Sequence, residues 1–141
     1  MLRQPRQTKF KKYRKGRISP CYETKAINLQ FGIYGIQALE KSKLTSKQLE
    51  SVRRTITNYV KRKVKIWIRA FPDVPLTKKP LEVRMGRGKG NVNIWVCKVN
   101  KGKILFEVAG PNPKLLILAL KQAQNKLPIK TQIISKIEDL V

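Results

Sequence analysis

The chain has 141 residues, of which 41% are hydrophobic, so it is long enough for one domain with a real core. Its 32 lysines and arginines and 8 acidic residues give a formal net charge of +24, which favours a polyanionic partner, with nucleic acid first and an anionic membrane surface second. Histidine is absent, the two cysteines form no C-x-x-C pair and the carboxylates are scattered, so the composition argues against an enzyme and a metal site. No apolar run reaches the length of a membrane span, which argues against a membrane protein.

The first seventeen residues form a strongly basic segment that we expect to be an extended arm. It contains no acidic residue, and Pro5 and Gly16 discourage a continuous helix. Phe10 and Tyr13 stand among the cations, where they can stack on bases. This composition is typical of a segment that orders on RNA, while a targeting peptide and a solubilising tail are the alternatives. The predicted RNA contacts here are Arg3, Arg6, Lys9, Lys11, Lys12, Arg14, Lys15 and Arg17.

A strand and a helix are predicted after the arm. Residues 27–39 alternate apolar and polar side chains, with glycines that suggest a bulge or a close backbone contact. Thr45 and Gln48 have the spacing of a capping box, and apolar residues then recur at helical spacing up to Val60. The opposite helix face is basic, and it is either solvated or placed against phosphates. Its candidate RNA contacts are Lys47, Arg54 and Lys61.

The next predicted strand is Val64–Phe71, which alternates strictly. One face is apolar, and the other mixes cations with aromatics, which suits either nucleic-acid contact or packing under a helix. Prolines then mark an irregular connection over 72–80. Three further strands are predicted at 81–85, 92–99 and 103–109, with residues 100–102 turning a hairpin between the last two. A helix capped by Asn112 and stopped by Pro128, and a strand at 129–134, complete the order.

A glycine-rich stretch, R-M-G-R-G-K-G-N, occupies residues 84–91 between two of the predicted strands. It therefore predicts a long basic hairpin tip whose backbone can approach an anion closely, because glycine has no side chain in the way. The P-loop and the dinucleotide fingerprint both require different glycine spacings. A merely solvated hairpin is the alternative. The candidate RNA contacts in the stretch are Arg84, Arg87, Lys89 and Asn91.

These elements predict an α+β fold, a mostly antiparallel sheet sandwich with two packed helices. The chain is divided into a basic N-terminal arm (1–26), a single α+β RNA-binding domain (27–135) and a C-terminal tail (136–141). No catalytic residue, cofactor or metal ligand is assigned.

The whole pattern resembles the large-subunit ribosomal protein family numbered sixteen in bacteria, which is related to the archaeal and eukaryotic tenth protein. Residues 18–30 and the second helix match it weakly, and Asn93-Ile94 replaces a usual Glu-Tyr pair. The matching runs are Phe31-Gly32 with Gly35, Lys65-Ile66-Trp67-Ile68-Arg69, Phe71-Pro72-Asp73, Val83-Arg84-Met85-Gly86, Gly88-Lys89-Gly90-Asn91 and Leu127-Pro128-Ile129-Lys130-Thr131.

The resemblance implies a protein with no catalytic activity that binds large-subunit rRNA beside the aminoacyl-tRNA site and the peptidyl transferase centre. It implies that the arm and the hairpin help to place the acceptor end of tRNA, that neighbouring ribosomal proteins are partners, and that the protein is neither membrane-bound nor a homo-oligomer. In some members the arginine matching Arg84 is hydroxylated.

Two other function classes are weighed against this one. An RNA-modifying or nucleotide-using enzyme is disfavoured by the missing histidine and the failed P-loop spacing. A free nucleic-acid chaperone or DNA-binding protein would explain the charge but not the matching run over 65–91. The start of the chain at the family's usual first residue and its Lys, Ile and Asn content favour a mitochondrial ribosome, with a plastid or the bacterial cytoplasm as alternatives.

Overall fold

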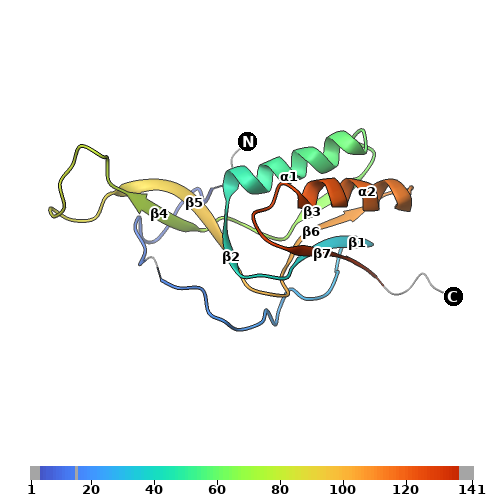
Figure 1. Ribbon diagram of the computed structural model, residues 1–141, viewed down its shortest axis with the longest axis horizontal. Helices are drawn as coiled ribbons and strands as arrows, with labels where there is room; N and C mark the ends of the chain where they lie inside the picture. The colour runs from blue at the N-terminus through green and yellow to red at the C-terminus, as the bar shows by residue number, and fades with distance from the viewer. Residues whose placement is uncertain (1–3, 15, 137–141) are drawn as a thin grey trace.

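The computed structural model describes residues 4–14 and 16–136, which fold into two helices and two antiparallel sheets. Both helices lie on one side of the larger sheet, and a two-stranded extension with a long loop projects from the smaller one (Figure 1). The elements in chain order are β1 (Tyr34–Ala38), β2 (Ser42–Thr45), α1 (Ser46–Tyr59), β3 (Lys65–Ile68), β4 (Val74–Lys78), β5 (Asn91–Val99), β6 (Ile104–Ala109), α2 (Pro113–Gln124) and β7 (Thr131–Ser135).

The larger sheet has the strand order β3-β6-β1-β7, and the smaller has the order β2-β5-β4. Every strand pair in both sheets is antiparallel. The predicted α+β class with two packed helices is therefore confirmed. The core lies between the helices and the larger sheet, where Ile36, Phe106 and Val108 of the sheet are fully buried.

Helix α1 begins where the sequence predicts. The Gln48 backbone N–H donates to Thr45 Oγ1 at 3.3 Å, and the Thr45 backbone N–H donates to Gln48 Oε1 at 2.8 Å. These two bonds satisfy donors that the first turn of a helix leaves free. The apolar face buries Leu49, Val52 and Ile56 as predicted.

Helix α2 has Asn112 at its N-cap and Pro113 at its first position. The Asn112 side chain makes no capping hydrogen bond, so the fixed φ of proline is what favours the helical start. The helix ends at Gln124, before the expected stop at Pro128. Its buried residues are Leu116, Ala119, Leu120 and Ala123.

The predicted strand at 81–85 is wrong. The partner of β5 is β4, which pairs Val74 with Val96 and Lys78 with Asn91, and residues 79–90 form the loop. Pro75 suggested an irregular connection, but β4 is an edge strand, where a residue without an N–H is tolerated. A Cβ at Gly90 would lie 2.7 Å from the Lys78 carbonyl oxygen, so glycine is what lets the loop close here. The hairpin loop is longer than expected.

The predicted hairpin around residues 100–102 is also wrong, because β5 and β6 belong to different sheets. Gly102 has a φ of +90°, and its N–H donates to the Ala38 carbonyl at 2.7 Å. The turn therefore carries the chain from one sheet to the other. The prediction assumed that strands next to each other in sequence pair with each other, which is usual but does not hold here.

The strand expected at 27–39 shrinks to β1, and residues 22–33 instead lie along the side of the larger sheet away from the helices. The Ile104 N–H donates to the Ala26 carbonyl at 2.9 Å, and the Ile33 N–H donates to the Val108 carbonyl at 3.0 Å. The division of the chain at residues 26 and 27 stays a prediction. Neither helix of the described residues has the length and apolarity that crossing a bilayer requires.

Candidate RNA-binding surface

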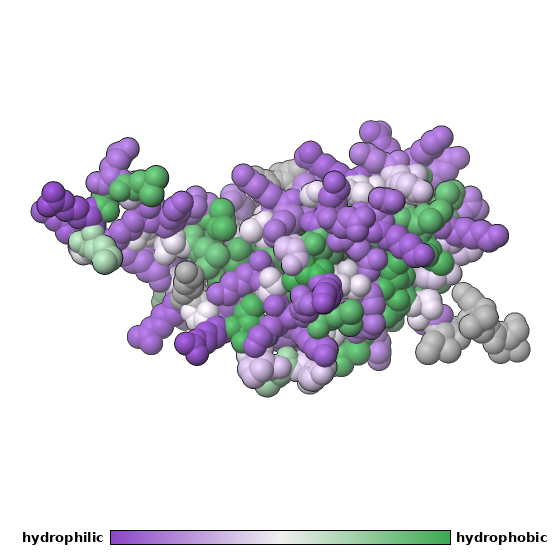
Figure 2. All heavy atoms as spheres, in the orientation of Figure 1, coloured by the Kyte–Doolittle hydropathy of each residue, from purple (hydrophilic) through white to green (hydrophobic). Residues whose placement is uncertain are grey.

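Hydrophilic side chains gather over helix α1 and at the far end of loop 79–90 (Figure 2). The predicted RNA contacts that the structure describes are all exposed. They are Arg6, Lys9, Lys11, Lys12, Arg14, Arg17, Lys47, Arg54, Lys61, Arg84, Arg87, Lys89 and Asn91. Arg3, Lys15 and most of the predicted tail lie outside the described residues.

The arm and the loop meet at the base of the hairpin, although they are more than seventy residues apart in sequence. Lys12 Nζ donates to the Lys89 carbonyl oxygen at 2.8 Å, and Lys89 Nζ donates to the Tyr13 carbonyl oxygen at 2.5 Å. Each segment thus supplies one ammonium group to the backbone of the other. Two groups of cations that the sequence left unconnected form one continuous basic surface.

Two lysines that were not predicted as site residues also hold the arm. Lys43 Nζ of β2 donates to the Gly16 carbonyl oxygen at 3.1 Å, and Lys98 Nζ of β5 lies 5.0 Å from the centroid of the Tyr13 ring. The arm therefore lies against the smaller sheet. No sequence pattern marks these contacts, because they join distant residues through an irregular segment.

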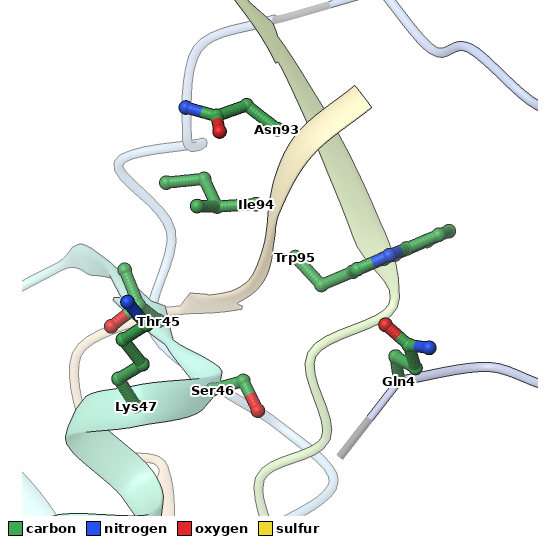
Figure 3. Close-up of a pocket in the computed structure, with 7 residues that line it drawn as sticks. All are labelled: Gln4, Thr45, Ser46, Lys47, Asn93, Ile94 and Trp95. Atoms are coloured by element: carbon green, nitrogen blue, oxygen red, sulfur yellow. The ribbon is translucent and has the colours of Figure 1, made fainter. Parts of the chain in front are cut away.

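The start of the arm reaches a cavity of about 170 Å³ at the N-terminal end of α1 (Figure 3). Lys47 is there, at the second position of a helix whose first turn has no acidic residue. The N-terminal end of a helix is positive, so a cation at this place is unfavourable unless an anion lies near. Lys47 therefore adds positive charge to the positive end of the helix. The lining residues are Gln4, Thr45, Ser46, Lys47, Asn93, Ile94 and Trp95.

The middle of α1 carries a charge cluster around Glu50. Arg53 Nη2 lies 2.8 Å from Glu50 Oε1, and Arg54 Nε lies 3.1 Å from the same oxygen. The hydrogen bond from Arg53, opposed by burial and supported by Arg54, lowers the pKa of Glu50 to about 2. The carboxylate is thus ionised at neutral pH, and its negative charge partly offsets the positive charge of the two arginines. Arg54 is therefore a weaker phosphate ligand than its exposure suggests.

The end of α1 turns through two cations in the left-handed region. Lys61 has a φ of 48° and Arg62 a φ of 63°. This conformation costs energy for residues other than glycine, and such strain is found most often at functional sites. Arg62 was not predicted as a site residue. It lines a groove of about 540 Å³ together with Arg53, Arg54, Thr57, Asn58, Val64 and Ile66.

The loop presents its cations outward on a backbone with several left-handed residues. Gly86 and Gly88 have φ of 105° and 84°, and Arg87 between them has a φ of 50°. Lys79 Nζ donates to the Gly86 carbonyl oxygen, which ties one side of the loop to its tip. At the tip, Met85 is 98% exposed. The loop is therefore an open cationic surface, with backbone and side-chain donors facing solvent.

The described residues offer no cluster of potential metal ligands, and their buried thiol is not a reactive one. They contain no group of three or more His, Cys, Asp or Glu side chains that could hold a metal ion. Cys97 is 3% exposed, and burial raises the pKa of its thiol, which keeps the sulfur protonated and unreactive. Basic surface, irregular arm and long loop are the features that remain.

Comparisons with known proteins identify the family of the chain. The family described as "Ribosomal protein L16p/L10e" matches residues 5–134. "Large ribosomal subunit protein uL16" from Buchnera aphidicola subsp. Baizongia pistaciae is 51% identical over 134 residues, which cover 95% of this chain and 97% of the relative. Its counterpart from Maricaulis maris is 46% identical over 134 residues, with the same coverage.

These relatives are bacterial, which supports the bacterial alternative and gives no support to the mitochondrial expectation. Since the match extends over nearly the whole chain, the protein belongs to the L16p/L10e family of ribosomal proteins, structural and non-enzymatic constituents of the large subunit that bind rRNA.

Proposed function

We propose that the protein lies beside the aminoacyl-tRNA site of a bacterial-type large ribosomal subunit, where its arm and its hairpin loop approach the peptidyl transferase centre. The observation that carries the proposal is the junction of Lys12, Tyr13 and Lys89, which makes the arm and the loop one basic projection. A projection of this length and charge can pass between RNA segments and reach a site far from the folded domain. Arm and loop therefore act together in positioning tRNA.

The RNA-binding residues of this proposal fall into two classes. The cations of the arm and the loop lie on irregular backbone and contact tRNA or the RNA next to it. Lys47, Arg54 and Lys61 stand on α1 or its last turn and serve rRNA anchoring. In this division the folded domain 27–135 holds the protein on rRNA, and the arm 1–26 and the loop extend from it.

A charge-reversal pair tests the loop. Arg84→Glu with Arg87→Glu changes the tip and spares Lys89, which also contacts the arm. A lost charge-assisted contact is worth about 1.5–3 kcal/mol, so the affinity of reconstituted large subunits for aminoacyl-site tRNA should fall by about tenfold or more. The reconstituted subunits are isolated by sedimentation and titrated with labelled tRNA.

The matched control is Lys114→Glu with Lys126→Glu, which changes the net charge equally on exposed positions of and beyond α2. It should leave tRNA affinity near wild type. Both free proteins should melt like the wild type, because exposed substitutions change stability by no more than about 0.5 kcal/mol. Equal tRNA affinity for the loop variant, the control and the wild type would remove the loop from tRNA positioning.

A further inference from the structure

The side of the larger sheet away from the helices carries an exposed aromatic ring in a fixed position. Phe31 is 57% exposed, although it is a large apolar side chain. Its ring stacks on Trp67 of β3 with centroids 6.1 Å apart and planes 20° apart. The Arg69 guanidinium carbon lies 5.3 Å from the Phe31 centroid. Trp67 and Arg69 therefore both contact the ring, while more than half of Phe31 faces solvent.

The backbone under this ring is fixed by a buried carboxylate. Glu107 of β6 is 0% exposed, and its Oε2 accepts hydrogen bonds from the backbone N–H groups of Gln30 at 3.1 Å, Phe31 at 2.7 Å and Gly32 at 2.8 Å. Its Oε1 accepts from Arg69 Nη1. One side chain thus holds both the segment that carries Phe31 and the cation beside the ring.

The segment also lies too close to the sheet to shift inward. A Cβ at Gly32 would lie 2.7 Å from the Val108 backbone nitrogen and 2.8 Å from its carbonyl oxygen. The Ile33 N–H donates to that same carbonyl at 3.0 Å. Phe31 therefore has little freedom to fold its ring back into the core, and a ligand that stacks on it loses little conformational entropy in ordering the site.

We propose that Phe31 is a stacking platform for an unpaired base of RNA. The proposal rests on the family's rRNA binding and adds a contact of a different kind. Arg69 lies over the Phe31 ring and is paired with Glu107, so its charge is directed to the carboxylate and the exposed part of the ring offers an apolar aromatic surface. With a net charge of +24, the surrounding surface draws the phosphate backbone toward the protein. A base that is not paired can then leave its own stack and cover the ring.

The test uses a single-stranded RNA hexanucleotide that contains 2-aminopurine and the same sequence in a fully paired duplex. Phe31→Leu keeps an apolar side chain and removes the aromatic face. Stacking on an aromatic side chain changes affinity by about 5- to 160-fold per base, so binding of the single strand should weaken by a factor in this range. Binding of the duplex should not change. The quenching of 2-aminopurine fluorescence by the wild type should be lost.

Phe31→Trp is the rescue variant, and it should restore both the affinity and the quenching. Tyr59→Leu is the matched control, because Tyr59 is an aromatic residue of α1 that is 43% exposed, and it should behave as the wild type. All variants are checked by circular dichroism for the wild-type fold. The slope of log affinity against log salt should stay the same in Phe31→Leu, since no phosphate contact is removed.

Wild-type binding of the single strand by Phe31→Leu would overturn the platform and leave rRNA binding intact. An equal loss of affinity for the single strand and the duplex would also overturn the platform, since it would point to damage of the charged surface. A Phe31→Leu chain that does not fold, together with a Phe31→Trp chain that folds but does not quench, would overturn it as well. Absence of RNA binding by the wild type at low salt would contradict the proposed function itself.

Discussion

Glu107 is a fully buried carboxyl group that nevertheless keeps its negative charge. Burial raises the pKa of its carboxyl, but hydrogen bonds from the Gly32 and Phe31 backbone N–H groups and from Arg69 act more strongly in the other direction, so the pKa of Glu107 lies below its ordinary value. The carboxylate is therefore ionised when buried, with three backbone N–H donors on Oε2 and Arg69 on Oε1. Such a group stabilises the fold only while its partners remain in place.

Replacing Glu107 by glutamine tests this dependence. Glu107→Gln keeps the shape but leaves Arg69 without its negative partner and brings an NH₂ group toward backbone donors. Breaking a buried ion pair costs about 3–5 kcal/mol, so the free energy of unfolding in urea should fall by an amount of this order. Glu40→Gln is the control, because that side chain is 49% exposed and 3.9 Å from Lys130, and it should change stability by no more than about 0.5 kcal/mol.

The pH dependence of stability follows from Glu50. Its pKa is about 2 in the folded protein and 4.5 ordinarily, so the folded state binds the proton less tightly than the unfolded state. The carboxylate's stabilisation is therefore complete above about pH 4.5 and is lost as the pH falls toward 2. The exposed arginine partners limit it to about 1 kcal/mol. Urea unfolding at several pH values should show a shallower acid decline in Glu50→Gln than in the wild type; equal declines would contradict the assignment.

At the scale of elements, the hairpin of β4 and β5 determines where the loop begins. Pro75 in β4 has no N–H to donate, and donors alternate along an antiparallel strand, so we expect the Val74 and Leu76 N–H groups to be those that face β5. Residues 79–90 lie between the last paired residues, Lys78 and Asn91, and so outside the ladder. The long basic loop is a consequence of the strand lying further upstream than its composition suggests.

A pair of leucine-to-proline changes distinguishes the two possible strands. Leu76→Pro removes a ladder donor and should lower the unfolding free energy by about 1–3 kcal/mol. Leu81→Pro lies in a turn where Val83 N–H donates to the Pro80 carbonyl at 3.3 Å, and proline is favoured at the second position of such turns. It should leave thermal melting nearly unchanged. The reverse order of effects would restore the strand at 81–85.

The sequence was informative where structure depends on near neighbours. The capping box of Thr45 and Gln48 joins residues three apart, and the apolar face of α1 follows from helical spacing, so both could be predicted. The platform of Phe31 depends on Glu107, which is seventy-six residues away, and no local pattern connects them. The junction of Lys12 and Lys89 is missed for the same reason, while the left-handed turn at Lys61 and Arg62 contains no glycine to indicate it.

At the scale of the whole molecule, the described part of the first seventeen residues is hydrogen-bonded to the domain through lysine side chains and backbone carbonyls. Phe10 and Tyr13 are exposed, and the hydrogen bonds that hold the arm lie at the surface. Exposed polar contacts contribute little to stability compared with apolar burial. The arm is thus an attachment to the fold rather than a part of its core.

Deleting residues 1–17 should therefore leave the folded domain intact. Thermal melting should shift by only a few degrees, while amide hydrogen exchange in residues 86–90 should become faster, because Lys12 no longer donates to the Lys89 carbonyl. Incorporation of the truncated chain into large subunits should fall. A truncated chain that cannot fold would show that the arm is part of the core. Unchanged amide exchange at residues 86–90 would show that the arm does not stabilise the loop.

Pro75 also bears on the time before the protein meets RNA. β4 is the outer strand of its sheet, and a free strand edge is a template for pairing with another polypeptide. Proline interrupts the row of donors that such pairing needs, and the exposed Lys78 at the end of the strand repels a second copy of the same charge. A newly synthesised chain thus carries its own protection against edge-to-edge aggregation, independent of any partner.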